Sequence, residues 1–157
     1  MKMFERLQAK KKDNKGFSLV ELIIVIAIMA ILVGVVGTQV VPYLNKSKVA
    51  KDQQLLSAYA TAAVSAYSYV ADKLTETGTI TINVFGSNSG DAAIIKAEMD
   101  NLINYDRATL KSKMSSVHGK SVDTNDIVIT MNQSHHTVLV HLNGTGSPAV
   151  PDAEATL

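Results

Sequence analysis

The longest apolar stretch of the chain lies close to its N-terminus. No residue from Leu22 to Asn45 carries a charge, and the part up to Val36 consists almost wholly of Ile, Val, Leu, Ala and Met. A helix rises ~1.5 Å per residue, so a run of this length crosses most of a bilayer core of ~30 Å. The pattern therefore predicts a helix that spans a membrane or bundles with other apolar helices.

A two-faced helical pattern continues beyond this stretch. Apolar residues alternate at spacings of four and three, which aligns Leu56, Ala60, Ala63, Tyr67, Val70 and Leu74 on one face. The opposite face is polar and holds Ser57, Thr61, Ser65, Ser68 and Asp72. Because residues 44–74 contain neither Gly nor Pro and are rich in Ala, we expect one nearly continuous helix from about Phe17 to Leu74.

Shorter elements are predicted in the second half of the chain. They are a strand at residues 79–85, a helix capped by Asp91 and ending near Asn104, a helix at residues 106–115, and strands at residues 127–131 and 137–142 that form a hairpin. Gly78 suits the position just past the long helix. A long helix with a small antiparallel sheet packed on its amphipathic half is an α+β fold. The order of the strands does not follow from the sequence.

These patterns divide the chain into four parts. We expect a basic leader at residues 1–16, an apolar membrane and assembly helix at 17–41, a globular head at 42–142, and a flexible tail at 143–157. The tail contains Gly144, Gly146, Pro148 and Pro151, which favour loop or disorder.

The charge of the chain is unevenly distributed. The formal net charge is +1, from fifteen basic and fourteen acidic residues. Residues 1–16 hold six of the basic and two of the acidic residues, a net +4, so the rest of the chain carries nine and twelve, a net −3. A basic segment directly before an apolar helix keeps the N-terminus in the cytoplasm. The mildly acidic remainder shows no nucleic-acid-binding footprint.

An ordinary secretory signal also has a basic and an apolar region. Glu21 interrupts the start of the apolar region here, and no small-x-small cleavage site followed by a polar break comes after it. A plain uncleaved membrane anchor would explain the length of the apolar segment, but not the Gly16-Phe17 pair before it or the carboxylate of Glu21. A carboxylate inside a membrane segment costs about 2–3 kcal/mol or more unless it finds a partner. Glu21 therefore suggests a partner that arrives from another molecule.

The segment Lys15-Gly16-Phe17-Ser18-Leu19-Val20-Glu21, with the basic stretch before it, resembles the class III signal of type IV prepilins. The resemblance covers roughly residues 10–40. It implies that a membrane prepilin peptidase cuts between Gly16 and Phe17 and methylates the new amine of Phe17. It further implies a pilin fold, storage in the cytoplasmic membrane, and assembly by pilus machinery into a cell-surface fibre of identical subunits.

The resemblance thus predicts a structural subunit of a type IV pilus-like fibre, with roles in adhesion or twitching motility, and not an enzyme. In the fibre, Glu21 could pair with the freed amine of Phe17 on the adjacent subunit. Three alternatives stay open: a pseudopilin or competence-type subunit of a secretion or DNA-uptake system, a minor pilin, or a membrane-anchored binding module with no assembly role. Secretion pseudopilins commonly bind calcium in a C-terminal loop, for which this tail supplies only Asp152 and Glu154.

The long helix has one weak zone. Gly34, Gly37 and Thr38 are poor helix formers, and Pro42 lacks the amide that would bond to a carbonyl four residues back. Membrane helices tolerate such residues, which is one interpretation. The other, implied by the resemblance, is a segment that unwinds on assembly.

Other candidate chemistry is weak. Without cysteine, neither a disulfide nor thiol catalysis is available, so we expect packing alone to stabilise the head. No nucleophile elbow or phosphate-binding loop is present, and we predict no cofactor. His118, His135, His136 and His141 lack a nearby acid or cysteine that would complete a metal site, so we expect them on the surface or an edge strand.

A cluster of lysines follows the apolar segment. Lys46, Lys48 and Lys51 form either a solvated helix face or a set of partners for acids of neighbouring subunits, such as Asp52 or Asp72.

Overall fold

The computed structural model describes residues 16–123 and 126–157. The predicted leader therefore lies outside the described residues except for Gly16. The chain divides into two compact units, one ending at Val41 and one comprising Pro42–Leu157. Each unit has its own organisation.

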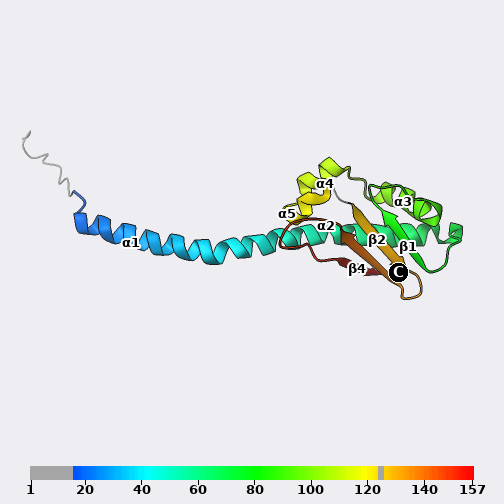
Figure 1. The fold of residues 1–157 in the computed structure, drawn as a ribbon, viewed down its shortest axis with the longest axis horizontal. Coiled ribbons are helices and arrows are strands. Elements are labelled where there is room, and N and C mark those ends of the chain that lie inside the picture. Colours follow the sequence, from blue (N-terminus) through cyan, green and yellow to red (C-terminus); the bar gives the residue numbers. More distant parts are fainter. Residues whose placement is uncertain (1–15, 124–125) are drawn as a thin grey trace, which may run out of the picture. The chain divides into compact units, whose positions relative to one another are not determined.

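One long run of helix begins the described chain. It consists of α1 (Leu19–Val35), a π-helical segment η1 (Val36–Val40), α2 (Val41–Val70) and a 3₁₀ turn η2 (Ala71–Lys73). Helical residues follow one another without a gap from Leu19 to Lys73, as Figure 1 shows. The prediction of a nearly continuous helix from Phe17 to Leu74 is confirmed, within two residues at its start and one at its end.

The predicted weak zone coincides with the π-helical segment Val36–Val40. Gly37 lies within it, and Pro42 follows two residues after it. A proline has no N–H to donate to a helical hydrogen bond, and glycine restricts the backbone least. A π-helical turn, which is wider than an α-helical turn, therefore forms here most readily. The hydroxyl of Thr38 donates to the carbonyls of Gly34 and Val35, at 3.2 and 3.3 Å, and supports the widened turn. The segment remains helical in this structure.

A four-stranded antiparallel sheet forms the second layer of the head. Its strands are β1 (Thr79–Asn83), β2 (Ile127–Asn132), β3 (Thr137–Leu142) and β4 (Ala153–Thr156). They lie in the order β1-β2-β3-β4, which is the order along the chain. The three predicted strands and the hairpin are confirmed, and with them the α+β fold.

The expectation of a flexible tail is wrong for its last part. Ala153 pairs with Val140 and Thr156 with Thr137, so β4 completes the sheet next to β3. Val150 and Ala153 are buried. Ala and Glu have low strand propensity, and Pro151 precedes the strand. The strand therefore owes its existence to pairing with β3 and to burial of its inner face, neither of which a local pattern reveals.

The core lies between α2 and one face of the sheet. Buried residues alternate along each strand and face buried partners across the ladder, such as Ile82 opposite Ile129 and Ile129 opposite Val140. The helix buries four residues of the face predicted from the sequence and three residues outside that pattern, whereas Tyr67 and Leu74 of the predicted face are only partly buried. The four are Leu56, Ala60, Ala63 and Val70, and the three are Tyr59, Ala62 and Ala66. The predicted polar residues of the other face are exposed. Burial of apolar surface at about 25 cal/mol per Å² holds these two layers together.

Short helices complete the head. They are α3 (Gly90–Leu102), α4 (Arg107–Lys113), α5 (Val117–Lys120) and a 3₁₀ turn η3 (Ser121–Asp123). The prediction of the first two is confirmed, whereas α5 was not predicted. Asp106 caps α4 by accepting the backbone N–H of Thr109 at 2.7 Å. Hydrogen bonds from the side chain and the backbone of Thr109 lower the pKa of Asp106.

Asp52 is a buried carboxylate that joins α2 to the segment before α5. Its side chain has no exposed surface and accepts the backbone N–H groups of Ser115 and Ser116, at 2.6 and 2.8 Å. The Ser116 hydroxyl also donates to it. The hypothesis that Asp52 pairs with a lysine of a neighbouring subunit is therefore wrong, because these internal donors already enclose the carboxylate.

Asp91 makes the same kind of contact at the other end of α2. It is 2 % exposed and accepts the backbone N–H groups of Thr75 and Glu76, at 2.7 and 2.6 Å. Ser89, not Asp91, occupies the N-cap position of α3. The predicted cap is thus wrong: Asp91 points back to the chain that leaves α2. Gly78, expected at the end of the helix, lies instead directly before β1 with φ of 115°.

His118 extends the Asp52 contact to the C-terminal segment. Its ring is 6 % exposed, and its Nδ1 accepts the backbone N–H of Val150 at 3.0 Å. An accepting Nδ1 requires the neutral ring with its proton on Nε2. A Cβ on the neighbouring Gly119 would lie 2.2 Å from the Asp52 carboxylate, so only glycine fits there. Both the surface location expected for His118 and the expectation that packing alone stabilises the head are wrong.

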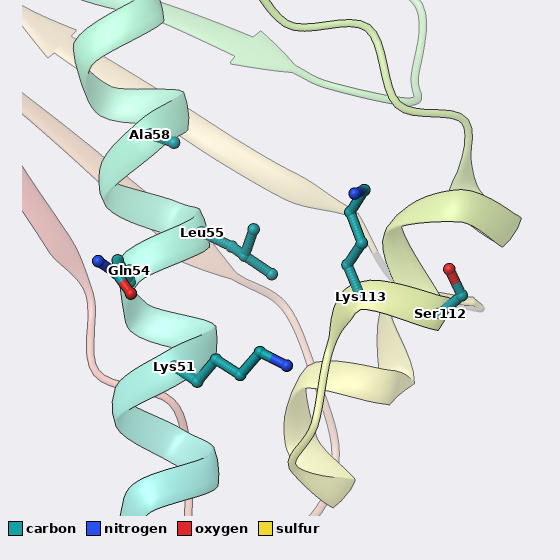
Figure 2. A pocket seen from close by; sticks show the side chains of 6 residues that line it. All are labelled: Lys51, Gln54, Leu55, Ala58, Ser112 and Lys113. Atoms are coloured by element: carbon teal, nitrogen blue, oxygen red, sulfur yellow. The ribbon is translucent and has the colours of Figure 1, made fainter.

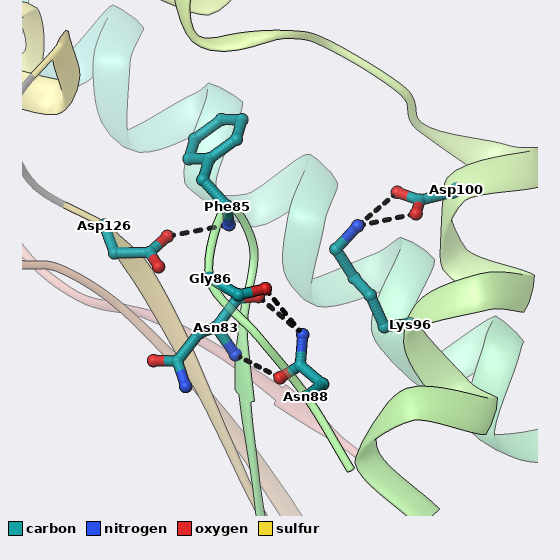
Figure 3. Close-up of polar contacts among 7 residues, drawn as sticks. All are labelled: Asn83, Phe85, Gly86, Asn88, Lys96, Asp100 and Asp126. Carbon is teal, nitrogen blue, oxygen red and sulfur yellow. Dashed lines mark hydrogen bonds and ion pairs between the residues drawn. The ribbon is translucent and has the colours of Figure 1, made fainter.

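Side-chain hydrogen bonds also close the loop between β1 and α3. The Asn88 side chain accepts from Asn83 N and donates to Asn83 O, both at 2.8 Å, and so imitates a neighbouring strand. The Asp126 carboxylate accepts the backbone N–H of Phe85 at 2.9 Å. Figure 3 shows these contacts beside the ion pair between Lys96 and Asp100.

Replacing Asp52 tests its structural role. Asp52→Ala leaves two buried N–H groups and one hydroxyl without an acceptor, and each costs about 1–3 kcal/mol. We expect the free energy of unfolding to fall by about 3 kcal/mol or more, as measured by urea unfolding of the head. The exposed Asp72 is the matched control, because Asp72→Ala should change the free energy by no more than about 0.5 kcal/mol. Equal effects of the two substitutions would contradict the role of Asp52.

Deleting residues 1–41 should leave a folded, soluble head. Every residue of the hydrophobic core belongs to the unit Pro42–Leu157, so the deletion removes none of it. Circular dichroism and size-exclusion chromatography of the deleted protein check this expectation. An unfolded or aggregated product would show that the apolar segment is part of the fold.

Candidate processing and assembly site

The predicted cleavage site lies in non-helical chain directly before α1. Gly16, Phe17 and Ser18 are all exposed and outside the helix, and 86 % of the Phe17 surface is accessible. Ser18 is the N-cap residue, with the extended values φ −68° and ψ 141°. A protease needs an extended and accessible substrate backbone, and the junction between Gly16 and Phe17 provides one.

The glycine at this junction has no role in the fold. A Cβ at Gly16 would meet no atom within 4 Å, and the residue does not adopt a positive φ. The local structure therefore accepts any side chain at position 16. A requirement for glycine can only come from a molecule that binds this segment.

Glu21 has a local partner that the sequence analysis overlooked. Its Oε2 accepts the backbone N–H of Ser18 at 2.8 Å, while the Ser18 carbonyl accepts the N–H of Leu22 at 3.2 Å. Ser18 and Glu21 form a capping box, in which the third helical residue reaches back to the N-cap amide. The signal was present as Ser-x-x-Glu directly before an apolar run. The negative charge also lies at the positive end of the helix dipole.

The helix that follows contributes nothing to the core. None of the 17 residues of α1 is buried in the chain. Its large apolar side chains are about half exposed or more, from 49 % for Val25 to 73 % for Leu19. By length and composition, the continuous helix Leu19–Lys73 that begins with α1 is the one described helix that could cross a membrane. Water is a poor solvent for such a surface, so lipid or other apolar helices must cover it.

Two glycines of the apolar segment are likewise not required by the fold. A Cβ at Gly34 or Gly37 would meet nothing within 4 Å in this chain. Glycine costs about 1 kcal/mol in a helix relative to alanine. Small residues let helix backbones approach one another closely in membranes, which is a use for Gly34 outside the single chain.

The four histidines, which are the other candidate ligands in the sequence, lie apart from this site. In residues 16–123 and 126–157, no three side chains of His, Cys, Asp or Glu lie close enough to hold a metal ion. His141 Nδ1 lies 2.6 Å from the Asp152 carboxylate, and His135 contacts Asn132. His136 occupies the turn between β2 and β3 with φ of 52°. The structure thus brings together Gly16, Phe17 and Glu21, and keeps the four histidines in separate structural contacts.

Comparison with protein families identifies the N-terminal segment. Residues 11–37 match the family described as the prokaryotic N-terminal methylation motif. This segment is a class III signal peptide of type IV pilins. The match spans the cleavage junction, the capping box and all of α1. No curated protein and no solved structure shows a significant match to the chain.

The class III signal has direct consequences for the protein. It supports a type IV pilin-like prepilin, implies processing by a prepilin peptidase, and fits a membrane-anchored prepilin. It also implies a structural subunit rather than an enzyme. The match ends at residue 37, so it carries no information on the role of the head.

Proposed function

We propose that the chain is the structural subunit of a type IV pilus-like extracellular fibre. It is stored in the cytoplasmic membrane as a prepilin, cut between Gly16 and Phe17, methylated at the amine of Phe17, and polymerised through its apolar helix. Its partners are other copies of itself, the prepilin peptidase, the pilus assembly machinery, and membrane lipid before assembly. In the fibre, the head faces outward.

The observation that carries this proposal is the exposure of α1, which lies within the signal segment and has no residue buried in the chain. A helix of 17 residues without one buried residue serves no purpose in the chain's own fold. Lipid covers it in the precursor, and copies of the same helix replace the lipid in the fibre. The self-contained core of the head supports the same division, because the head stays folded while the helix changes its surroundings.

Glu21 gives the polymer its register. The cut creates an amine on Phe17, and an amine of one subunit can approach the carboxylate of the next. Featureless apolar helices can slide along one another, whereas a buried charge pair fixes one position. In the single chain the capping box with Ser18 holds the carboxylate, so Glu21 does not stand uncompensated before assembly.

The length and location of the polymer separate this proposal from its alternative. A pseudopilin or competence-type subunit carries the same signal and the same apolar helix, but forms a short fibre in the cell envelope. Asp152, one of the two acids available for a C-terminal calcium loop, already binds His141. Electron microscopy of labelled cells tests the proposal: we expect long surface fibres that contain this chain. Short, envelope-bound assemblies would contradict it.

Replacing Gly16 tests the processing step. Gly16→Leu leaves the fold unchanged, because a side chain there meets nothing within 4 Å. We expect uncut precursor to accumulate in the membrane and surface fibres to disappear, as seen by immunoblotting of membrane and sheared fractions. Gly34→Leu is the control for added bulk within the signal segment, and it should be cut normally. Normal cutting of the Gly16 variant would exclude this junction as the processing site.

Two replacements at Glu21 separate its charge from its capping contact. Glu21→Gln retains an oxygen that can accept the Ser18 N–H, whereas Glu21→Ala removes both the contact and the charge. If the charge fixes the register, both variants should insert in the membrane and both should assemble poorly. We expect the ratio of sheared fibre to membrane-held subunit to fall about tenfold or more in each, since an unpaired buried charge costs about 3–5 kcal/mol. Assembly of the glutamine variant at the parental level would reduce Glu21 to a helix cap.

A further inference from the structure

A groove runs between α2 and α4 on the surface of the head. Its volume is about 460 Å³, and its walls comprise Lys51, Gln54, Leu55, Ala58, Ser112 and Lys113. Figure 2 shows Lys51 and Leu55 extending from α2 toward α4, with Lys113 rising from α4 on the facing side. The groove therefore has an apolar floor and a cationic side chain on each wall.

Neither lysine has an acidic partner among the residues that the structure describes. Lys51 and Lys113 are exposed, and the ion pairs within residues 16–123 and 126–157 involve neither of them. Lys113 lies above the ring of Tyr105, with its Nζ 4.9 Å from the ring centre, which holds the side chain in place without neutralising it. Two like charges beside an apolar floor favour a ligand that is anionic and partly apolar.

Matching acids lie at the far end of α2. Asp72 and Glu76 are exposed, stand four residues apart where the long helix ends, and form no ion pair with any described residue. Leu74, half-buried, lies between them and adds apolar surface. Of the other acids, Asp100 binds Lys96 and Asp152 binds His141, whereas Glu154 is exposed on β4 without a second unpaired acid beside it. Asp72 and Glu76 thus offer the charge and the apolar surface that the groove lacks.

These two surfaces cannot meet within one molecule. Lys51 and Asp72 are carried by the same helix and lie about 30 Å apart at ~1.5 Å per residue. The charges of each surface can therefore be paired only with those of another molecule. A contact between two different surfaces of identical subunits is heterologous, and it generates a ring if its rotation closes and an open helical filament if it does not.

We propose that the groove formed by Lys51, Leu55 and Lys113 receives the Asp72–Glu76 end of a second copy of this chain. This contact rests on the proposed function, since it supplies a head-to-head connection along the fibre in addition to the packing of the apolar helices. The charges orient the approaching subunit, and the apolar floor excludes water from the contact. The groove therefore sets the axial order of the heads.

Engineered cysteines test this contact directly, because the natural chain has none. Lys113→Cys combined with Glu76→Cys in the full-length chain should produce a ladder of disulfide-linked dimers, trimers and larger oligomers in sheared fibres under mild oxidation. The ladder requires the two residues to come within disulfide reach, about 5.5 Å between Cα atoms. The control pair is Lys120→Cys with Glu76→Cys, whose lysine lies outside the groove and should give no ladder. Absence of a ladder from the groove pair, or dimers alone, would overturn the contact.

Charge exchange provides the second test. Lys51→Glu with Lys113→Glu makes the contact repulsive, and we expect the yield of sheared fibre to fall about tenfold or more. Adding Asp72→Lys and Glu76→Lys to the same chain restores attraction and should return the yield to within about threefold of the parent. Lys120→Glu, the control, should assemble normally.

The outcomes of the exchange separate the contact from the proposed function. If the parent forms no fibre, the proposed function and this contact both fall. If the parent forms fibres but the fourfold variant assembles no better than the double variant, only the contact falls. Loss of the double variant from the membrane would show that the groove binds an anionic lipid surface, which also overturns the contact.

Discussion

Asp52 and Asp91 each accept hydrogen bonds from two consecutive backbone amides of a segment distant in the chain. Both carboxylates are almost fully buried, so each depends on these donors to replace water. The donors in turn fix the course of the chain at both ends of the amphipathic part of α2. In a head without cysteine, these two contacts perform the tethering that a disulfide performs elsewhere.

The contact at Asp52 is connected to the C-terminal part of the head. Ser116, which donates to Asp52, also caps α5 by accepting the N–H of Gly119 at 2.8 Å. The same short helix carries His118, whose ring holds the backbone at Val150. Three residues later the chain enters β4 and completes the sheet. A single buried carboxylate on α2 is thereby linked, through Ser116 and His118, to the segment that enters β4.

Because the head is complete in itself, the apolar helix is free for other partners. Its side chains take no part in the core, and two of its glycines are not needed by the fold. A subunit that must leave a membrane and enter a polymer needs this separation, since its apolar surface changes environment while its outer domain must not unfold. The π-helical turn at Val36–Val40 interrupts the regular α-helical hydrogen bonding of the long helix.

Local patterns predicted most of the architecture. The spacing of apolar residues fixed the inner face of α2, and alternation located β1, β2 and β3. The cut between Gly16 and Phe17 stays a prediction, which rests on the linear motif that Gly16, Phe17 and Glu21 form. The roles of Asp52, Asp91 and His118 were not predictable, since their partners lie far away in the sequence and a polar residue in a helix is usually exposed. The groove at Lys51 and Lys113 was not predictable either, because it lies between two helices that are far apart in the sequence. The capping box at Ser18 had a local signal, the Ser-x-x-Glu spacing, which the charge of Glu21 alone does not reveal.

The N-terminal residue of the chain in its assembled form tests the account most directly. Mass spectrometry of fibres sheared from the cell surface should find a chain that begins at Phe17, carries one methyl group on its amine, and lacks residues 1–16. A surface-assembled chain that still begins at Met1, or a chain cut within or after the apolar helix, would contradict the account.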